Sequence, residues 1–250
     1  MKSYSASLIN ELQKQISKKK NYVLLVITAL IPVAAALLIA FFQGGLGIAP
    51  VRSLDFPVYI LGVFTKLLLP LFIFMTTADI FAGEIGDHTV KASLLRPVTR
   101  LRIYAAKISC TGLFILVFLA LIYIVSVICS IFLGTDGAFL TGVLTAAGQY
   151  FAAFLPLLLL GIISSFIALL AGGSSGALVL SLLVFIAAKT VGLVLPGVSG
   201  YLFTSYIDWY LLLASGTASL SKVAGVFMFI LSYGIIFLGS GYLLFERKEL

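Results

Sequence analysis

The sequence predicts an all-α, polytopic membrane protein with six transmembrane helices, an N-terminal amphipathic surface helix and a short cytoplasmic helix between the second and third spans. Apolar residues make up 62% of the chain and charged residues only 10%, whereas a soluble domain carries about 25% charged residues. Several apolar runs reach the roughly 20 residues that a helix needs to cross a bilayer. The 250 residues therefore form one transmembrane domain, without room for a large soluble domain beside it.

Residues 1–20 are polar and basic, and within them Leu8, Leu12 and Ile16 recur every four positions. This spacing predicts a helix that lies on the membrane with its apolar stripe in the lipid boundary. A disordered basic tail is the alternative. The charged region and the apolar run that follows are both too long for a signal peptide.

The spans are predicted from apolar runs that polar or glycine-rich loops separate. Residues 196–221 are mixed and contain Asp208, Trp209 and several tyrosines. They predict an outer-surface hairpin anchored by interfacial aromatic side chains, or a segment whose start re-enters the membrane. The six spans are expected near residues 22–42, 62–81, 111–133, 142–170, 177–195 and 223–245.

The distribution of basic residues predicts the orientation. Six spans place both termini on one side, and loops on the cytoplasmic side carry an excess of Lys and Arg. Of the 16 basic residues, five lie in the N-terminal segment, five in the central loop and two in the C-terminal tail. We therefore expect both termini in the cytoplasm and a bacterial plasma membrane as the location.

Residues 79–107 differ from the rest of the chain, because they hold eight of its 25 charged residues and its only histidine, His88. Asp87 is a candidate N-cap for a short helix over residues 88–95. The position before Pro97 is biased away from the helical region, so the helix ends there. This pattern predicts a short cytoplasmic helix between two spans, where a water-soluble partner docks.

The stretch GEIGDHTVKASLL followed by RPVTRLRIYAAK resembles the region between the second and third helices of ABC-2-type permeases, the membrane subunits of a group of ABC exporters. The family pattern is an acidic residue, a Gly-Thr-like turn, two leucines, then Pro-x-x-Arg and a later basic residue. Asp87-His88-Thr89 departs from the usual Gly-Thr. The matching positions are Glu84, Gly86, Leu94, Leu95, Pro97, Arg100 and Lys107.

The resemblance implies a permease subunit of an ATP-driven exporter, in which a coupling helix meets a separate ABC ATPase. Two ATPase copies and a second permease, identical or related, would complete a dimeric transporter; ATP and Mg would bind the ATPase, and this chain would hold no cofactor. Relatives of this kind move peptide antibiotics, drugs or lipids and confer multidrug or peptide resistance, and the apolar spans favour an amphipathic or lipid-like cargo. The residues expected to couple are Glu84, Asp87, His88, Val90, Lys91, Leu94, Leu95, Pro97 and Arg100.

Two polar residues inside predicted spans are candidates for the translocation pathway. Lys66 either snorkels to the headgroups or faces a water-filled cavity and meets an anionic group of the substrate. Gln149 shares the fourth span with Pro156, which predicts a tilted, bent or broken helix. Ordinary packing and a substrate-facing bend both explain this pair of residues.

Other functions find little support in the residues. Glu84 and His88 lie four apart, as metal ligands on a helix do, but the chain has no second histidine and no HExxH motif. It lacks the phosphate-binding GxxxxGK[ST] motif, so we expect neither ATP hydrolysis nor another enzyme activity. Cys110 and Cys129 lie about 28 Å apart on one helix and are expected to pack rather than to pair.

The net charge of +7 is better explained by membrane lipid and topology than by nucleic acid, because the basic residues flank apolar runs. A self-sufficient ion channel or secondary carrier is the alternative function, although no convincing repeat of two halves is present. A sensing or scaffold membrane protein is a third possibility, for which Lys66 and Gln149 would be replaceable.

Overall fold

The computed structural model describes residues 2–46, 53–83, 99–134, 139–214 and 219–247. These residues are helical apart from turns and short connections, and they contain no strand. Six of the helical segments are long and apolar enough to cross a membrane. The predicted all-α membrane fold is therefore confirmed.

Each predicted span has a helical counterpart, and the second span is compound. It runs through four consecutive segments, two of them π-helical. The elements are α1 (Lys2–Ile16), α2 (Lys19–Leu46), α3 (Phe56–Val63), η1 (Phe64–Leu68), α4 (Leu69–Thr77), η2 (Ala78–Gly83), α7 (Arg100–Phe132), α8 (Phe139–Leu170), α9 (Ser174–Val194), α10 (Pro196–Ser199), η3 (Phe203–Tyr206), α11 (Tyr210–Ala214) and α12 (Leu220–Arg247).

The helices extend beyond the predicted spans at several ends. The second begins at Phe56 rather than near 62, and the third begins at Arg100 rather than near 111. A window of about 20 residues underestimates both helices, because the third continues with a polar end and the second with the apolar segment Phe56–Leu61. Thr99 precedes α7 as expected of a cap, but its side chain makes no capping hydrogen bond.

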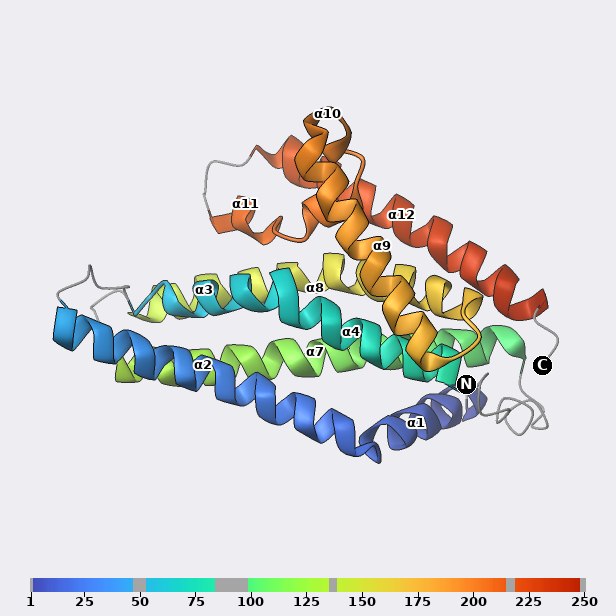
Figure 1. Ribbon diagram of the computed structural model, residues 1–250, viewed down its shortest axis with the longest axis horizontal. Coiled ribbons are helices and arrows are strands. Elements are labelled where there is room, and N and C mark those ends of the chain that lie inside the picture. The colour runs from blue at the N-terminus through green and yellow to red at the C-terminus, as the bar shows by residue number, and fades with distance from the viewer. Residues whose placement is uncertain (1, 47–52, 84–98, 135–138, 215–218, 248–250) are drawn as a thin grey trace.

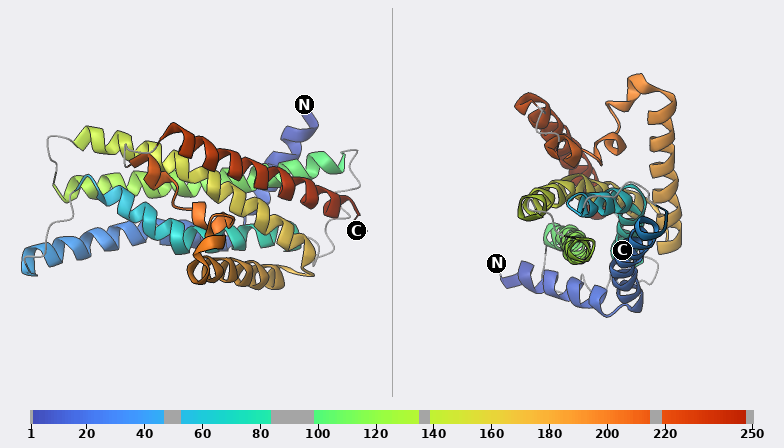
Figure 2. Two further views of the ribbon diagram at one scale, coloured as in Figure 1. Left: turned by 90° about the horizontal axis from the view of Figure 1, so that it is seen from above. Right: turned by 90° about the vertical axis from the view of Figure 1, so that its left-hand side faces the viewer.

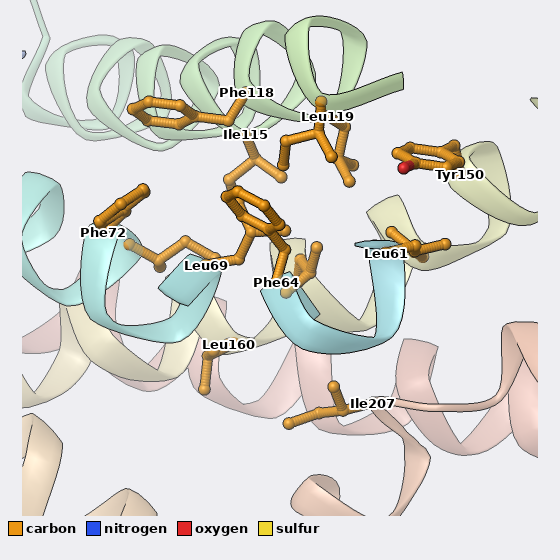
Figure 3. Close-up of a cluster of buried hydrophobic side chains, with 14 of the residues drawn as sticks. Leu61, Phe64, Leu69, Phe72, Ile115, Phe118, Leu119, Tyr150, Leu160 and Ile207 are labelled. Atoms are coloured by element: carbon orange, nitrogen blue, oxygen red, sulfur yellow. The ribbon is translucent and has the colours of Figure 1, made fainter. Parts of the chain in front are cut away.

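The bundle is built around α8, the most buried of the six spans. Helices α2, α7, α8 and the second span run side by side along the long axis, whereas α9 crosses them obliquely and α12 packs on α8 (Figures 1 and 2). The start of α1 and the end of α12 lie at the same end of the bundle (Figure 1). Figure 3 shows part of the core between the second span, α7 and α8, which includes Leu61, Phe64, Leu69, Phe72, Ile115, Phe118, Leu119, Tyr150 and Leu160.

The second span changes helix type near a proline. Pro70 has no N–H with which to bond the Lys66 carbonyl, its α-helical partner four residues earlier. The π-helical turn η1 lies just before this proline. The Nζ of Lys189 on α9 lies 3.5 Å from the same carbonyl oxygen. The interruption therefore exposes a backbone acceptor, and π-helical turns are frequent at functional sites.

The expected N-terminal helix forms, but its apolar residues do not all face the same way. Leu8 and Leu12 pack against a buried cluster to which the second span, α7, α8, α9 and α12 contribute, whereas Ile9 and Ile16 are each 54% exposed. The face of α1 that meets the bundle also carries the buried Glu11. Its protein-facing side is thus partly polar, which a stripe of leucines does not predict; its contact with lipid stays a prediction.

The prediction that interfacial aromatic residues anchor residues 196–221 is wrong for Trp209. Its side chain is buried, and its Nε1 donates a hydrogen bond to the Ala152 carbonyl of α8 at 2.8 Å. Tyr210 is buried as well. A tryptophan N–H needs a partner once it is buried, and the carbonyl on α8 supplies it, so this segment packs on the bundle. The free Cys110 and Cys129 are buried, which confirms their expected packing role.

Candidate functional site: a cavity between α3, α8 and α11

A cavity of about 710 Å³ lies between α3, η1, α8 and α11. It brings together Lys66 and Gln149, the two polar residues that the sequence singled out inside the spans. Their role in translocation stays a prediction. The lining consists of Leu54, Asp55, Val58, Tyr59, Gly62, Val63, Lys66, Thr141, Gly142, Thr145, Ala146, Gln149, Tyr210 and Leu211.

One wall is a stripe along the second span. Asp55, Tyr59, Gly62 and Lys66 follow one another at intervals of four, three and four residues, and this spacing places them on one helix face. Lys66 and Tyr59 are exposed. The stripe carries an acid where the helix begins and a base about three turns further in.

The opposite wall is a polar row on α8. Thr141, Thr145 and Gln149 recur every four residues and line the cavity together. The two threonines are exposed, whereas Gln149 is only 3% exposed. Within the described part of the chain, the Oε1 of Gln149 has no hydrogen-bond partner. This wall therefore offers a buried acceptor next to hydroxyl groups.

Tyr210 of α11 closes the cavity from the third side. Its hydroxyl lies 3.4 Å from the Thr65 hydroxyl, and a Cβ at Gly62 would lie 3.5 Å from it. Burial raises the pKa of Tyr210, the hydrogen bond with Thr65 lowers it, and the charge of Asp208 raises it. The net shift is upward, so this phenol stays protonated at neutral pH and can donate.

A second polar cluster lies at the other end of the bundle, where α1 meets α7 and η2. Lys107 of α7 donates to the Glu11 carboxylate at 3.1 Å and to the Ile80 carbonyl at 2.8 Å. Glu11 also accepts from Lys14 at 3.2 Å. The side chains of Glu11 and Lys107 are only 6% and 3% exposed. A buried ion pair is costly to separate, so it fixes α1 against the end of the second span.

Asp79 strengthens this attachment. It lies in η2 and forms ion pairs with Lys18, at 3.3 Å, and with Lys20. Lys18 lies in the junction between α1 and α2, and Lys20 lies in the first turn of α2. Asp79 therefore holds the end of the second span against the junction between α1 and α2 and the start of α2.

Most of the predicted coupling residues lie outside the described part of the chain. Arg100 is described: it begins α7, and it donates a hydrogen bond to the Glu246 carbonyl at the end of α12. This contact places the starting point of α7 beside the C-terminal helix. Glu84, Asp87, His88, Val90, Lys91, Leu94, Leu95 and Pro97 are outside the described residues.

Several residues of both sites were not predicted from the sequence. Thr141 and Thr145 share a four-residue spacing with Gln149, a signal that was available in the sequence. Tyr210 comes from a segment far along the chain, and its approach to Gly62 has no local signal. Glu11 stands on the polar side of an amphipathic helix, where an acid normally faces water.

The model of the ABC-2 family transporter protein matches residues 7–204, which is most of the chain. The chain belongs to the ABC-2 transporter family. A comparison with curated proteins gives no match. Membership identifies the molecule as a multi-pass permease subunit of an ABC transporter, and the family implies association with an ABC ATPase. The matched range includes α3, the start of α8 and Lys107, and ends before α11.

Proposed function

We propose that this ABC-2 permease forms one half of an ATP-driven exporter for an amphipathic or lipid-like cargo. The observation that carries the proposal is the cavity among the spans of a family member, because Lys66 and Gln149 line it together with apolar side chains. A second permease copy, identical or related, completes the pathway. Two separate ATPase subunits supply the energy.

The direction of transport follows from the proposed orientation. Basic residues concentrate at the end of the bundle that carries α1, the start of α7 and the end of α12, which favours a cytoplasmic position for that end. The cavity adjoins the beginnings of α3 and α8, at the opposite end. A cargo that leaves through this cavity is therefore released outward.

Coupling is proposed to pass through residues 84–98, which follow η2 and precede α7. ATP binding closes the ATPase pair, and the pair binds one permease state more tightly than the other. Before this segment, Asp79 forms ion pairs with the start of α2 and its junction with α1; after it, Lys107 of α7 pairs with Glu11 of α1. A displacement of the segment would thus reach the first two spans as well as the third.

Reconstitution tests this proposal. The permease, co-purified with its ATPase from the producing cell and placed in proteoliposomes, is expected to move a fluorescent amphipath only when ATP is present. Transport without the ATPase, driven by an ion gradient alone, would instead support a secondary carrier. Mass spectrometry of the co-purified material identifies the ATPase and any bound lipid or peptide in the same experiment.

A further inference from the structure

The cavity holds a buried acceptor that a ligand can satisfy. Gln149 is 3% exposed, and its Oε1 finds no partner among the described residues. Leaving a buried acceptor without a hydrogen bond costs free energy, because it has lost its bond to water without gaining one to the protein. A molecule that brings an N–H or O–H group to this oxygen recovers that free energy.

Lys66 also lines the cavity, and the acid at the other end of the same wall does not neutralise its charge. Asp55 and Lys66 both line the cavity, but they are eleven residues apart, about 16 Å along a helix. That distance is too long for a direct ion pair. The inner end of this wall is therefore positive, and an ammonium group within a span favours an anionic partner.

The remaining walls suit an apolar tail. Leu54, Val58, Val63, Ala146 and Leu211 all contribute to the lining. Tyr59 and Val63 are 62% and 52% exposed on a span. The edge of the cavity that they form therefore opens at the lateral surface of the bundle rather than along its axis. The volume of about 710 Å³ falls within the range of sites for one drug-sized molecule. It is too small to enclose a long peptide.

We propose that the cavity binds a single phospholipid whose headgroup carries both a phosphate and a hydrogen-bond donor. The phosphate lies at Lys66, an ammonium or hydroxyl group of the headgroup donates to Gln149 Oε1, and the start of an acyl chain lies along Val58 and Val63. Phosphatidylethanolamine and phosphatidylglycerol meet these requirements, whereas the choline group of phosphatidylcholine has no donor. This inference names the substrate class for the proposed function. The binding site follows from the cavity, and the role of the bound lipid as cargo rests on the proposed function.

Native mass spectrometry of the purified permease, without ATPase or ATP, tests the binding. The protein is released from micelles that contain equal amounts of phosphatidylethanolamine, phosphatidylglycerol and phosphatidylcholine, with glycerol phosphate as a soluble probe of the headgroup alone. We expect the two donor lipids to be retained about tenfold over phosphatidylcholine, the ratio that one hydrogen bond of about 1.4 kcal/mol gives. Glycerol phosphate is expected not to be retained, because it lacks the apolar part.

Two variants each remove one of the polar contacts, and a third serves as a control for general damage to the fold. Gln149→Leu is expected to bind phospholipid but to lose the preference over phosphatidylcholine. Lys66→Met is expected to lose retention of all three phospholipids, while Lys222→Met, an exposed lysine outside the lining, stays like the parent. If Gln149→Leu does not fold, Gly62→Leu replaces it: a Cβ fits there at 3.5 Å from the Tyr210 hydroxyl, and the longer side chain fills the cavity and blocks lipid.

Equal retention of the three lipids by the parent protein, or unchanged binding by Lys66→Met, would overturn the inference. Displacement of the lipid by a cationic amphipathic peptide but not by another phospholipid would assign the cavity to peptides and overturn it too. Selective lipid binding without ATP-driven transport in the reconstituted complex would leave the binding site standing and refute the proposed function.

Discussion

At the scale of single residues, burial and charge distinguish the side chains that hold the fold from those that face the cavity. Lys107 and Glu11 satisfy each other at 3.1 Å, whereas Gln149 Oε1 has no partner among the described residues. The sequence indicated Gln149 and Lys66, because a polar residue inside an apolar run needs an explanation. It did not indicate Glu11, because an acid on a polar helix face needs none.

Lys66→Met is expected to cut ATP-driven transport at least tenfold while assembly with the ATPase and its basal hydrolysis stay unchanged. The substitution keeps the length of the side chain and removes the charge that meets an anionic group. Transport from inside-out vesicles and ATP hydrolysis by the same complex are the two measurements. If Lys66 only snorkels to headgroups, transport stays at the parental level and the cavity assignment loses its main support.

Glu11→Gln is expected to destabilise the permease by about 3 kcal/mol, the lower end of the cost of removing one partner from a buried pair. The variant takes away the carboxylate that lies 3.1 Å from Lys107 Nζ. Chemical denaturation of the protein in micelles measures the change. Gln13→Ala, an exposed position on the same helix, is the matched control and should leave stability within about 0.5 kcal/mol of the parent.

The double variant Glu11→Leu with Lys107→Met separates the contribution of the ion pair to stability from that of the hydrogen bond to the Ile80 carbonyl. Apolar residues of similar volume often replace a buried ion pair without loss, so most of the stability lost in Glu11→Gln should return. Stability as low as that of the single variant would show that the lost hydrogen bond to the Ile80 carbonyl, rather than the ion pair, dominates this contact.

At the scale of elements, periodicity and length predicted which segments are helical, but not what each helix faces. A bilayer interior is as apolar as a protein core, so the apolar pattern of α8, which is largely buried, resembles that of α12, which is largely exposed. For the same reason Trp209 was expected in the headgroup region and lies against α8 instead. Tertiary contacts between distant segments decided these cases.

The segment between η2 and α7 carries a prediction that depends on its sequence alone. Leu94→Asp is expected to abolish recovery of the ATPase in pull-downs, because it would bury a charge in the groove that receives an apolar side chain, a cost of about 3–5 kcal/mol. Leu94→Met keeps an apolar side chain and serves as the control. Normal ATPase recovery by Leu94→Asp would mean that this segment is not the docking element.

Glu84→Gln is expected to behave differently from Leu94→Asp. It preserves the shape of the side chain, so the ATPase should still co-purify, but the loss of charge where the second span ends should weaken coupling. ATP hydrolysis per transported molecule measures this effect. An unchanged ratio of hydrolysis to transport would assign Glu84 a role in folding or none.

At the scale of the whole molecule, the ion pairs and the cavity lie at opposite ends of the bundle. The ion pairs of Glu11 and Asp79 lie where α1 meets the end of the second span, and the cavity lies near the beginnings of α3 and α8. The second span connects the two, with a π-helical turn at each site: η1 contains Lys66 and η2 contains Asp79. This continuous path is the physical basis on which a displacement at one end can alter the cavity at the other.

The last prediction concerns the orientation of the bundle in the membrane. Labelling of two positions at opposite ends of the bundle tests it. Ser219 is exposed just before α12, and Ser17 is exposed between α1 and α2. In a background without Cys110 and Cys129, both buried, a cysteine at Ser219 should react with an impermeant thiol reagent in intact cells. One at Ser17 should react only after the membrane is opened, because the excess of basic residues predicts a cytoplasmic position for that end. The reverse labelling pattern would show that the molecule has the opposite orientation and that the cavity lies at the cytoplasmic side. The proposed direction of transport would then be wrong.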